Sequence, residues 1–429
     1  MNLQEVKKLE QEEFIKRDSE LTFIASENYC SEDVLEACGS IFMQKYSEGF
    51  PQKRYYEGCE VVDKMELECI DTVLELFNAK EEYYAQVQCS SGASANFVVY
   101  NAILKPNDVV LAPDTASLGH ISHGHPKSFI AKYHQVETYG VDENGLLDYD
   151  EIERLAIKYS PKLIIAGASN YPRVILYDKF KEIADKVGAY LMADIAHTSV
   201  FHAHGLLQSP VGLADFITST THKCMGSARS AFILYKKDFH KAVCLSTIPT
   251  CFGGQLANMT YAKLVGFKEC LTEESKNRAI RVLENAKTMA DTFNKNNIPI
   301  VTGDTFNHLC TVDLRNFNIT GKQLSTLLAK AGFICNANTV PNDTRSFLET
   351  SGVRIGTPAV TTRGLRQGDI QHLIQHVCDI VNLYSNGQTP DDLTLEEKLH
   401  ALKVGVEYYC KKFPLKEMYP KTYKRLFEV

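Results

Sequence analysis

The sequence predicts an α/β protein built around a mostly parallel sheet. From about residue 83 to residue 236, short and nearly continuous apolar runs alternate with helical stretches. Strands in a parallel sheet have this pattern because helices cover both of its faces. The runs expected to form strands are VVLAP (109–113), LIIAG (163–167), AYLMAD (189–194), ADFITST (214–220) and AFILYK (231–236).

Helical segments are expected before, between and after these strands. Residues 1–20 are typical of a charged helix, and residues 61–77 carry apolar side chains at helical spacing. The helix before AYLMAD should end at Gly188, a typical C-cap residue. The chain becomes helical again after about residue 265, and HLCTVDL (308–314) and GVRIGTP (352–358) are further strand candidates. The expected division is an N-terminal arm (1–50), a large domain (51–275) and a small C-terminal α/β domain (276–429).

The composition excludes several classes of protein. With 429 residues, of which 44% are hydrophobic and 23% charged, the chain can bury a large core. A net charge of −7 argues against partners such as nucleic acid or anionic membranes, which need a basic surface. The N-terminus has no apolar signal region and no run is long enough to span a membrane, so we expect a cytoplasmic protein. The 13 cysteines form no C-x-x-C pair, which predicts reduced thiols and no metal site.

Two neighbouring predicted strands end in an acid and a lysine. Asp194 ends AYLMAD, with His197 three residues later, and His222 and Lys223 follow the next strand. The carboxyl edge of a parallel sheet is where ligands bind. Taken singly, Asp194 could cap a following helix and Lys223 could be a solvated charge. Together they match pyridoxal phosphate (PLP), which needs a lysine for a Schiff base and a carboxylate beside its ring nitrogen.

Other short motifs could hold the remaining groups of such a complex. In QCSSGASANF, Ser91 and Gly92 lead into an apolar-periodic helix whose first N–H groups could bind a phosphate, although ordinary capping explains the same pattern. Gly253 and Gly254 could add a second loop or form a simple turn. Arg354 could bind an amino-acid carboxylate with two hydrogen bonds, or be an ordinary surface arginine.

Several longer segments together resemble the serine hydroxymethyltransferase family, whose members are fold-type I PLP enzymes. The segments are IASENYCS, KYSEGFPQKRYYEGCEVVD, SSGASANF, LGHISHG, GAYLMADIAH, TSTTHK, NTVPND and TSGVRIGTPAVTTRG. The resemblance begins at about Leu21 and covers nearly the whole chain. It implies retro-aldol cleavage that interconverts serine and glycine, with tetrahydrofolate as the one-carbon carrier.

The resemblance also implies a role for each matching position. It implies that Lys223 is the Schiff-base lysine, Asp194 the partner of the ring nitrogen, and His120 the histidine stacked on the ring. The further cofactor contacts that it implies are Ser91, Gly92, Ser169, His197, His222, Tyr46, Gly253 and Gly254. The implied substrate contacts are Ser26, Tyr56 and Arg354, with Glu48 as the acid/base. Tyr46 and Glu48 would reach into a neighbouring subunit, which implies a homodimer with shared active sites and the possibility of a tetramer.

The sequence departs from the family pattern mainly near the expected folate pocket. After Lys223 it continues CMGSARSA, without the usual proline and glycines, and IPTCFGGQ replaces a glycine-rich loop. Ala93 stands in place of a serine, and Glu57 and Leu118 in place of glycines. Two functions therefore stay open: folate-dependent serine–glycine interconversion, or a folate-independent relative such as a threonine-type aldolase, a transaldolase or an α-methylserine-type enzyme. A pseudoenzyme is disfavoured because the lysine, both acids and the arginine are all kept.

Overall fold

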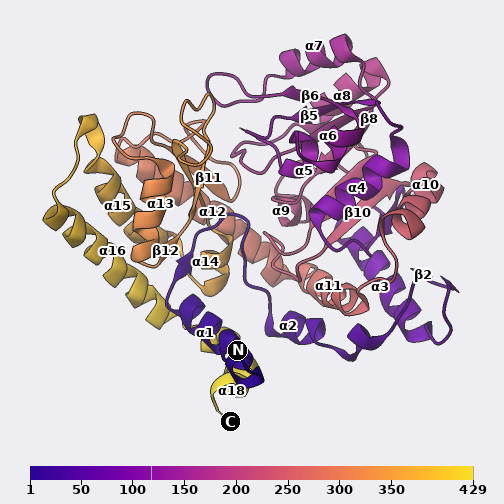
Figure 1. Cartoon of the computed structure of the whole chain (residues 1–429), viewed down its shortest axis with the longest axis horizontal. Coiled ribbons are helices and arrows are strands. Elements are labelled where there is room, and N and C mark those ends of the chain that lie inside the picture. The colour runs from indigo at the N-terminus through magenta and orange to yellow at the C-terminus, as the bar shows by residue number, and fades with distance from the viewer. Residues whose placement is uncertain (117, 429) are drawn as a thin grey trace. The chain divides into compact units, whose positions relative to one another are not determined.

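The computed structural model describes residues 1–116 and 118–428 (Figure 1). The chain forms two compact units. The first, called the large unit here, is Asp33–Ala279. The second, called the small unit, combines Met1–Glu32 with Ile280–Val429.

A seven-stranded sheet forms the centre of the large unit, in the order β4-β10-β9-β8-β7-β5-β6. All neighbouring strands from β9 to β6 are parallel, whereas β10 is antiparallel to both of its neighbours. The predicted mostly parallel α/β fold is therefore confirmed. The strands are β4 (Tyr83–Gln86), β5 (Val109–Pro113), β6 (Gln135–Tyr139), β7 (Leu163–Gly167), β8 (Tyr190–Asp194), β9 (Phe216–Thr220) and β10 (Ala231–Lys236).

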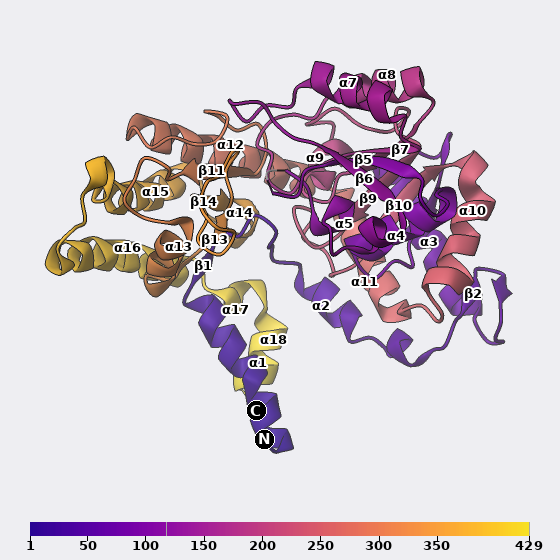
Figure 2. The same cartoon turned by 45° about the horizontal axis from the view of Figure 1, so that its top comes forward.

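Helices cover both faces of this sheet. Figure 2 shows α7 and α8 on one side and α4 and α11 on the other. Helix α8 ends at Gly188 in the left-handed conformation (φ 68°), as its sequence predicts. The helices of this unit are α2 (Glu32–Cys38), α3 (Glu60–Leu76), α4 (Gly92–Ile103), α5 (Ile121–Gly124), α6 (Phe129–Tyr133), α7 (Tyr149–Tyr159), α8 (Tyr177–Val187), α9 (Ser199–Ala203), α10 (His240–Leu245) and α11 (Ala257–Cys270). A short hairpin, β2 (Gly49–Phe50) and β3 (Lys53–Arg54), precedes α3.

The small unit contains a three-stranded sheet in the order β11-β14-β13. Its strands are β11 (Leu309–Asp313), β13 (Asn336–Asn338) and β14 (Gly352–Gly356), and a short parallel pair joins β1 (Leu21–Thr22) to β12 (Phe333–Ile334). Its helices are α1 (Leu3–Asp18), α13 (Gly321–Lys330), α14 (Pro358–Arg363), α15 (Gln367–Asn382), α16 (Asp392–Lys412), α17 (Leu415–Met418) and α18 (Pro420–Phe427), and most of α12 (Glu273–Lys295) belongs here too.

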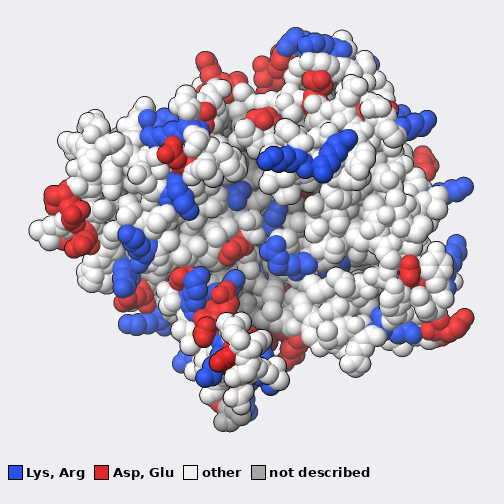
Figure 3. Space-filling view, in the orientation of Figure 1, with Lys and Arg blue, Asp and Glu red and all other residues white. Residues whose placement is uncertain are grey.

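The two ends of the chain meet inside the small unit. Both views show α1 beside α18, and the Phe14 ring lies 5.9 Å from that of Tyr423 and 5.7 Å from that of Phe427, centroid to centroid. No helix among the described residues is long and apolar enough to cross a membrane. On the face drawn in Figure 3, lysines and arginines are interspersed with aspartates and glutamates.

Candidate active site

Asp194 ends β8 at the carboxyl edge of the large sheet. Its Oδ2 accepts hydrogen bonds from His123 Nε2 (2.8 Å) and Asn96 Nδ2 (3.0 Å), and its Oδ1 accepts one from Ala196 N (3.0 Å). The carboxylate therefore caps no helix, which removes the alternative explanation of this residue. Since a carboxylate oxygen can accept two hydrogen bonds, Oδ1 keeps capacity for one more donor.

The surroundings of Asp194 keep it ionised. Burial acts to raise the pKa of this carboxyl group. The hydrogen bond and charge of His123 outweigh that effect, with help from Asn96 and the positive charge of Lys223, and the pKa falls well below its usual value. A carboxylate that stays charged in a buried place is the type of group that can hold a proton on a ring nitrogen.

Lys223 follows β9, the strand next to β8, and is 9% exposed. It is therefore not a solvated surface charge. The turn that holds it is fixed by hydrogen bonds from Gly226 N to Lys223 O (2.9 Å) and from the Thr221 hydroxyl to Ala228 O (2.6 Å). The Cys224 thiol also donates to His197 O (2.8 Å), which ties this turn to the segment after Asp194.

The N-terminus of α4 lies beside the end of β9. A Cβ on Gly92 would come within 2.8 Å of Thr220 Cγ2, so the close approach requires glycine. Ser91 and Ser94 form a capping box, in which the Ser91 hydroxyl accepts from Ser94 N (3.2 Å). Capping therefore does explain these serines, but the first N–H groups of the helix still lack partners within the helix and can bind an anion.

A chain of polar side chains connects α4 to the predicted stacking histidine. Asn96 Nδ2 bonds to the Ser122 hydroxyl (3.0 Å), and that hydroxyl lies 2.8 Å from His120 Nδ1. The His120 ring itself is exposed, so its face is accessible to a ligand. Ser169 follows β7, and its backbone N–H donates to Leu118 O (2.8 Å), two residues before His120.

These groups fit PLP. One sheet edge holds an ionised acid, a buried lysine and a helix N-terminus suited to a phosphate. His222 adds a buried Nδ1 that has no hydrogen-bond partner among the described residues. Burial lowers the pKa of His222 to about 3, and the charges of Arg229 and Lys223 act in the same direction, so the ring is neutral and can accept or donate a hydrogen bond.

Tyr46, Glu48 and the two loop glycines form a second group in the large unit. An ideal Cβ on Gly254 would lie 3.0 Å from the Tyr46 ring, and one on Gly253 would lie 3.6 Å from Glu48 Oε1. The Tyr56 ring also contacts Tyr46, with centroids 4.9 Å apart. The structure thus brings five predicted site residues together on neighbouring loops.

A buried ion-pair network holds these loops in place. Arg54 contacts Glu66 (2.6 Å) and Asp63 (2.8 Å), and both Gln88 (2.7 Å) and Gln255 (2.5 Å) donate to Glu66. Gln255 directly follows the two glycines, whereas Arg54 directly precedes the tyrosine pair. Because each charge is paired and hydrogen-bonded, the network can fix both loops without leaving a buried charge unsatisfied.

Arg354 and Ser26 lie in the small unit. Arg354 is on the central strand β14, where its Nε donates to Asn336 Oδ1 (3.3 Å), and burial lowers the pKa of its guanidinium to about 10. Ala25, beside Ser26, packs against β14, because an ideal Cβ on Gly356 would come within 2.5 Å of Ala25 Cα. Arg354 is therefore not an ordinary surface arginine, and an anion bound to it would offset its loss of solvent.

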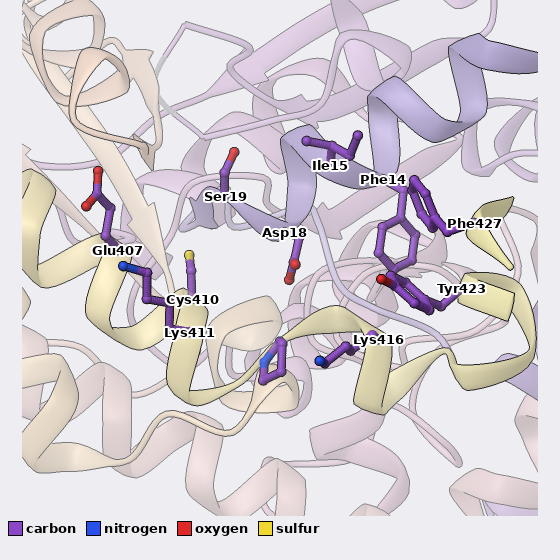
Figure 4. Close-up of a pocket in the computed structure, with 11 residues that line it drawn as sticks. Phe14, Ile15, Asp18, Ser19, Glu407, Cys410, Lys411, Lys416, Tyr423 and Phe427 are labelled. Carbon is purple, nitrogen blue, oxygen red and sulfur yellow. The ribbon is translucent and has the colours of Figure 1, made fainter.

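A cavity of about 590 Å³ lies elsewhere in the small unit (Figure 4). Figure 4 shows Phe14, Tyr423 and Phe427 gathered at one end and Glu407, Cys410 and Lys411 at the other. None of the predicted site residues lines it. The active-site assignment therefore rests on the sheet edge and not on this cavity.

The fold and the sheet-edge groups define a fold-type I PLP-dependent enzyme. A family model described as serine hydroxymethyltransferase matches residues 1–377. The chain therefore belongs to the serine hydroxymethyltransferase family, as the quoted segments predict. PLP-dependent chemistry on a small molecule follows from this membership.

Three residues that hold the site together were not predicted from the sequence. Asn96 and His123 bind Asp194 directly, and Ser122 links Asn96 to His120. Both Asn96 and His123 lie inside quoted motifs, SSGASANF and LGHISHG. Their only further signal is position, since Asn96 is one helical turn after Gly92 and His123 is three residues after His120.

Proposed function

We propose that this protein is a PLP-dependent serine hydroxymethyltransferase that moves a one-carbon unit between serine and tetrahydrofolate. The observation that carries the proposal is the ionised, buried Asp194 at the same sheet edge as the buried Lys223, in a chain of this family. When bound, PLP supplies an electron sink for the carbanion left by cleavage of the Cα–Cβ bond.

The residues of the sheet edge would hold the cofactor. Lys223 binds it covalently, and the Asp194 carboxylate keeps a proton on the ring nitrogen, so the sink stays effective. His120 covers the ring face, and the start of α4 at Ser91 and Gly92 binds the phosphate. The remaining contacts in this proposal are Ser169, His197 and His222 from the same sheet edge, with Tyr46, Gly253 and Gly254 from the second group.

The substrate would be oriented by its carboxylate. Arg354 binds that carboxylate with two hydrogen bonds, supported by Ser26 and Tyr56. Glu48, or a water that it positions, takes the proton of the substrate hydroxyl as the Cα–Cβ bond breaks. This division of roles is supported by the buried guanidinium of Arg354 and by the position of Glu48 next to the glycine loop.

Tetrahydrofolate is the acceptor that we favour. The substituted loop after Lys223 puts Ser227, Ala228, Ser230 and Ala231 in buried positions, and the Ser230 hydroxyl donates to Cys89 O (2.9 Å). These four substitutions therefore repack the interior and do not reshape a solvent-facing pocket. Asn338 on β13, Tyr55 and Glu48 remain as candidate folate contacts.

We further propose a homodimer with shared active sites. Several apolar or aromatic side chains between residues 41 and 61 are more than half exposed: Ile41, Met43, Tyr46, Tyr55 and Val61. A gathering of this kind on the surface marks an interaction site. A second copy that covers these loops would bury the aromatic residues and receive Tyr46 and Glu48 in its own site.

A turnover assay with and without folate tests the proposed reaction. The PLP-loaded protein is given L-serine, and glycine is quantified in the presence and absence of tetrahydrofolate. We expect glycine formation to depend on tetrahydrofolate and to be lost in Lys223→Ala. If serine and other β-hydroxy amino acids, such as allo-threonine, were cleaved as fast without tetrahydrofolate as with it, the folate-dependent function would be overturned in favour of an aldolase.

A further inference from the structure

Two histidines on α15 bring their ring nitrogens together at the surface of the small unit. His372 and His376 are four residues apart and so share one face of the helix. His372 is exposed and His376 half-buried. Their Nε2 atoms are 3.3 Å apart, whereas their ring centroids are 4.9 Å apart. The two nitrogens therefore point towards a common position instead of lying on parallel rings.

This separation matches a pair of metal ligands. Zinc binds histidine nitrogen at about 2.0–2.1 Å in tetrahedral geometry, which puts two ligand nitrogens about 3.3 Å apart. The same imidazole pair suits copper(II) and nickel(II), whereas magnesium and calcium prefer oxygen ligands. A direct N–H···N hydrogen bond between the rings gives a similar distance in the metal-free protein, and an ion would replace its proton.

A contact with α16 orients the His372 ring. The Tyr409 hydroxyl on α16 lies 3.2 Å from His372 Nδ1. When Nδ1–H donates to that oxygen, the Nε2 lone pair of His372 is left available, which is the arrangement found around metal-binding histidines.

The facing helix α16 approaches both rings at a glycine. Opposite the two rings, α16 carries Gly405, whose ideal Cβ would be 3.7 Å from His372 Cε1 and 3.8 Å from His376 Cδ2. Among the residues that the structure describes, no cluster of three or more His, Cys, Asp or Glu side chains could hold a metal. An ion here would have two protein ligands and complete its coordination with water.

We propose that His372 and His376 form a surface site for one divalent transition-metal ion of the zinc, nickel or copper class. The ion links two successive turns of α15, and binding to the folded chain stabilises the small unit by mass action. With two protein ligands, the site is exchangeable, unlike the four-ligand sites of structural zinc.

Calorimetric titration of the cofactor-loaded protein with nickel chloride tests this site. We expect one ion per chain and a binding constant at least about tenfold weaker in His372→Ala and in His376→Gln. The glutamine keeps a polar partner for His372 but does not replace the imidazole ligand, so this variant separates metal binding from the direct hydrogen bond. Thermal unfolding should shift upwards with nickel in the wild type and not in either variant.

Two matched variants serve as controls. His400→Ala removes an exposed histidine from the neighbouring helix α16. Cys244→Ser removes the thiol that lies 3.8 Å from both ring nitrogens of His240, the alternative pair for a soft metal. Both should bind nickel within about twofold of the wild type. The proposal would be overturned if the wild type bound no nickel. It would also be overturned if a control variant lost nickel binding while the two histidine variants kept it.

Discussion

At the residue scale, the site depends on keeping one buried acid charged. Burial acts to raise the pKa of Asp194, and the hydrogen-bond donors and positive charges around the carboxylate lower it by more. Asn96 contributes through one amide that bonds to both Asp194 and Ser122. Because α4 carries this amide and also begins at Ser91 and Gly92, one helix would hold both ends of the proposed cofactor.

Replacement of Asn96 by alanine should weaken cofactor binding. A hydrogen bond to a charged group contributes about 1.5–3 kcal/mol, so we expect the affinity of the apoprotein for PLP to fall roughly tenfold or more. Fluorescence titration with PLP measures this. Asn101→Ala is the control, because the Asn101 amide on the same helix donates to the Ser246 hydroxyl (3.1 Å) and not to Asp194. Equal affinity in the wild type and Asn96→Ala would show that the acid does not need this donor.

At the scale of elements, α11 anchors the segment that precedes Ser91 and Gly92, the proposed phosphate site. Lys263 on α11 is 1% exposed, and its ammonium donates to Val87 O, Ala231 O (3.0 Å) and, at 3.4 Å, Cys89 O. Val87 and Cys89 lie four and two residues before Ser91. Burial lowers the pKa of Lys263, because the ammonium loses its hydration. The three carbonyl oxygens that accept its hydrogen bonds stabilise the charge.

Lys263→Met should destabilise the protein. An unsatisfied buried carbonyl costs about 1–3 kcal/mol. Val87 O and Ala231 O lose this donor, whereas Cys89 O keeps the Ser230 hydroxyl, so we expect a loss of about 2–4 kcal/mol. Urea unfolding measures the change. Lys268→Met on the same helix removes an exposed ion pair with Glu68 (2.6 Å) and should change stability by less than about 1 kcal/mol. A Lys263→Met protein as stable as the wild type would mean that desolvation of the ammonium dominates.

The inner strands of the large sheet were predictable and its edges were not. VVLAP, LIIAG and AFILYK correspond residue for residue to β5, β7 and β10, because buried strands need continuous apolar runs. The edge strands β4 (YYAQ) and β6 (QVETY) were missed, because each has polar or exposed residues within it. The antiparallel direction of β10 has no sequence signal, since an apolar run is the same in either direction.

The site residues likewise divide into those that the sequence predicts and those that need the fold. Asp194 and Lys223 were predictable because strand ends in a parallel sheet converge on one edge. The supporting contacts of Asn96 and His123 depend on how α4 and α5 pack at that edge, which residue spacing alone does not determine. The grouping of Tyr46 and Glu48 with Gly253 and Gly254 joins loops about 200 residues apart, so it needed the fold as well.

At the scale of the whole molecule, the proposed dimer makes each active site depend on two chains. Lys223→Ala and Glu48→Gln should each be inactive alone. If Glu48 serves the partner's site, random mixing gives hybrids with one intact site, and activity should recover to about one quarter of the wild type. The mixture is unfolded, refolded together and assayed, with hybrid formation checked by native mass spectrometry. Hybrids without activity would show that the sites are not shared.

The central claim, that Lys223 binds the cofactor at the edge of the large sheet, has a direct chemical test. Borohydride reduces the bond between lysine and PLP to a stable amine, and peptide mass spectrometry then identifies the modified residue. We predict a single adduct on the peptide that contains Lys223, its absence in Lys223→Ala, and none on the more deeply buried Lys263, whose ammonium is held by backbone carbonyls. An adduct on another lysine, or PLP retained without any adduct, would contradict the account.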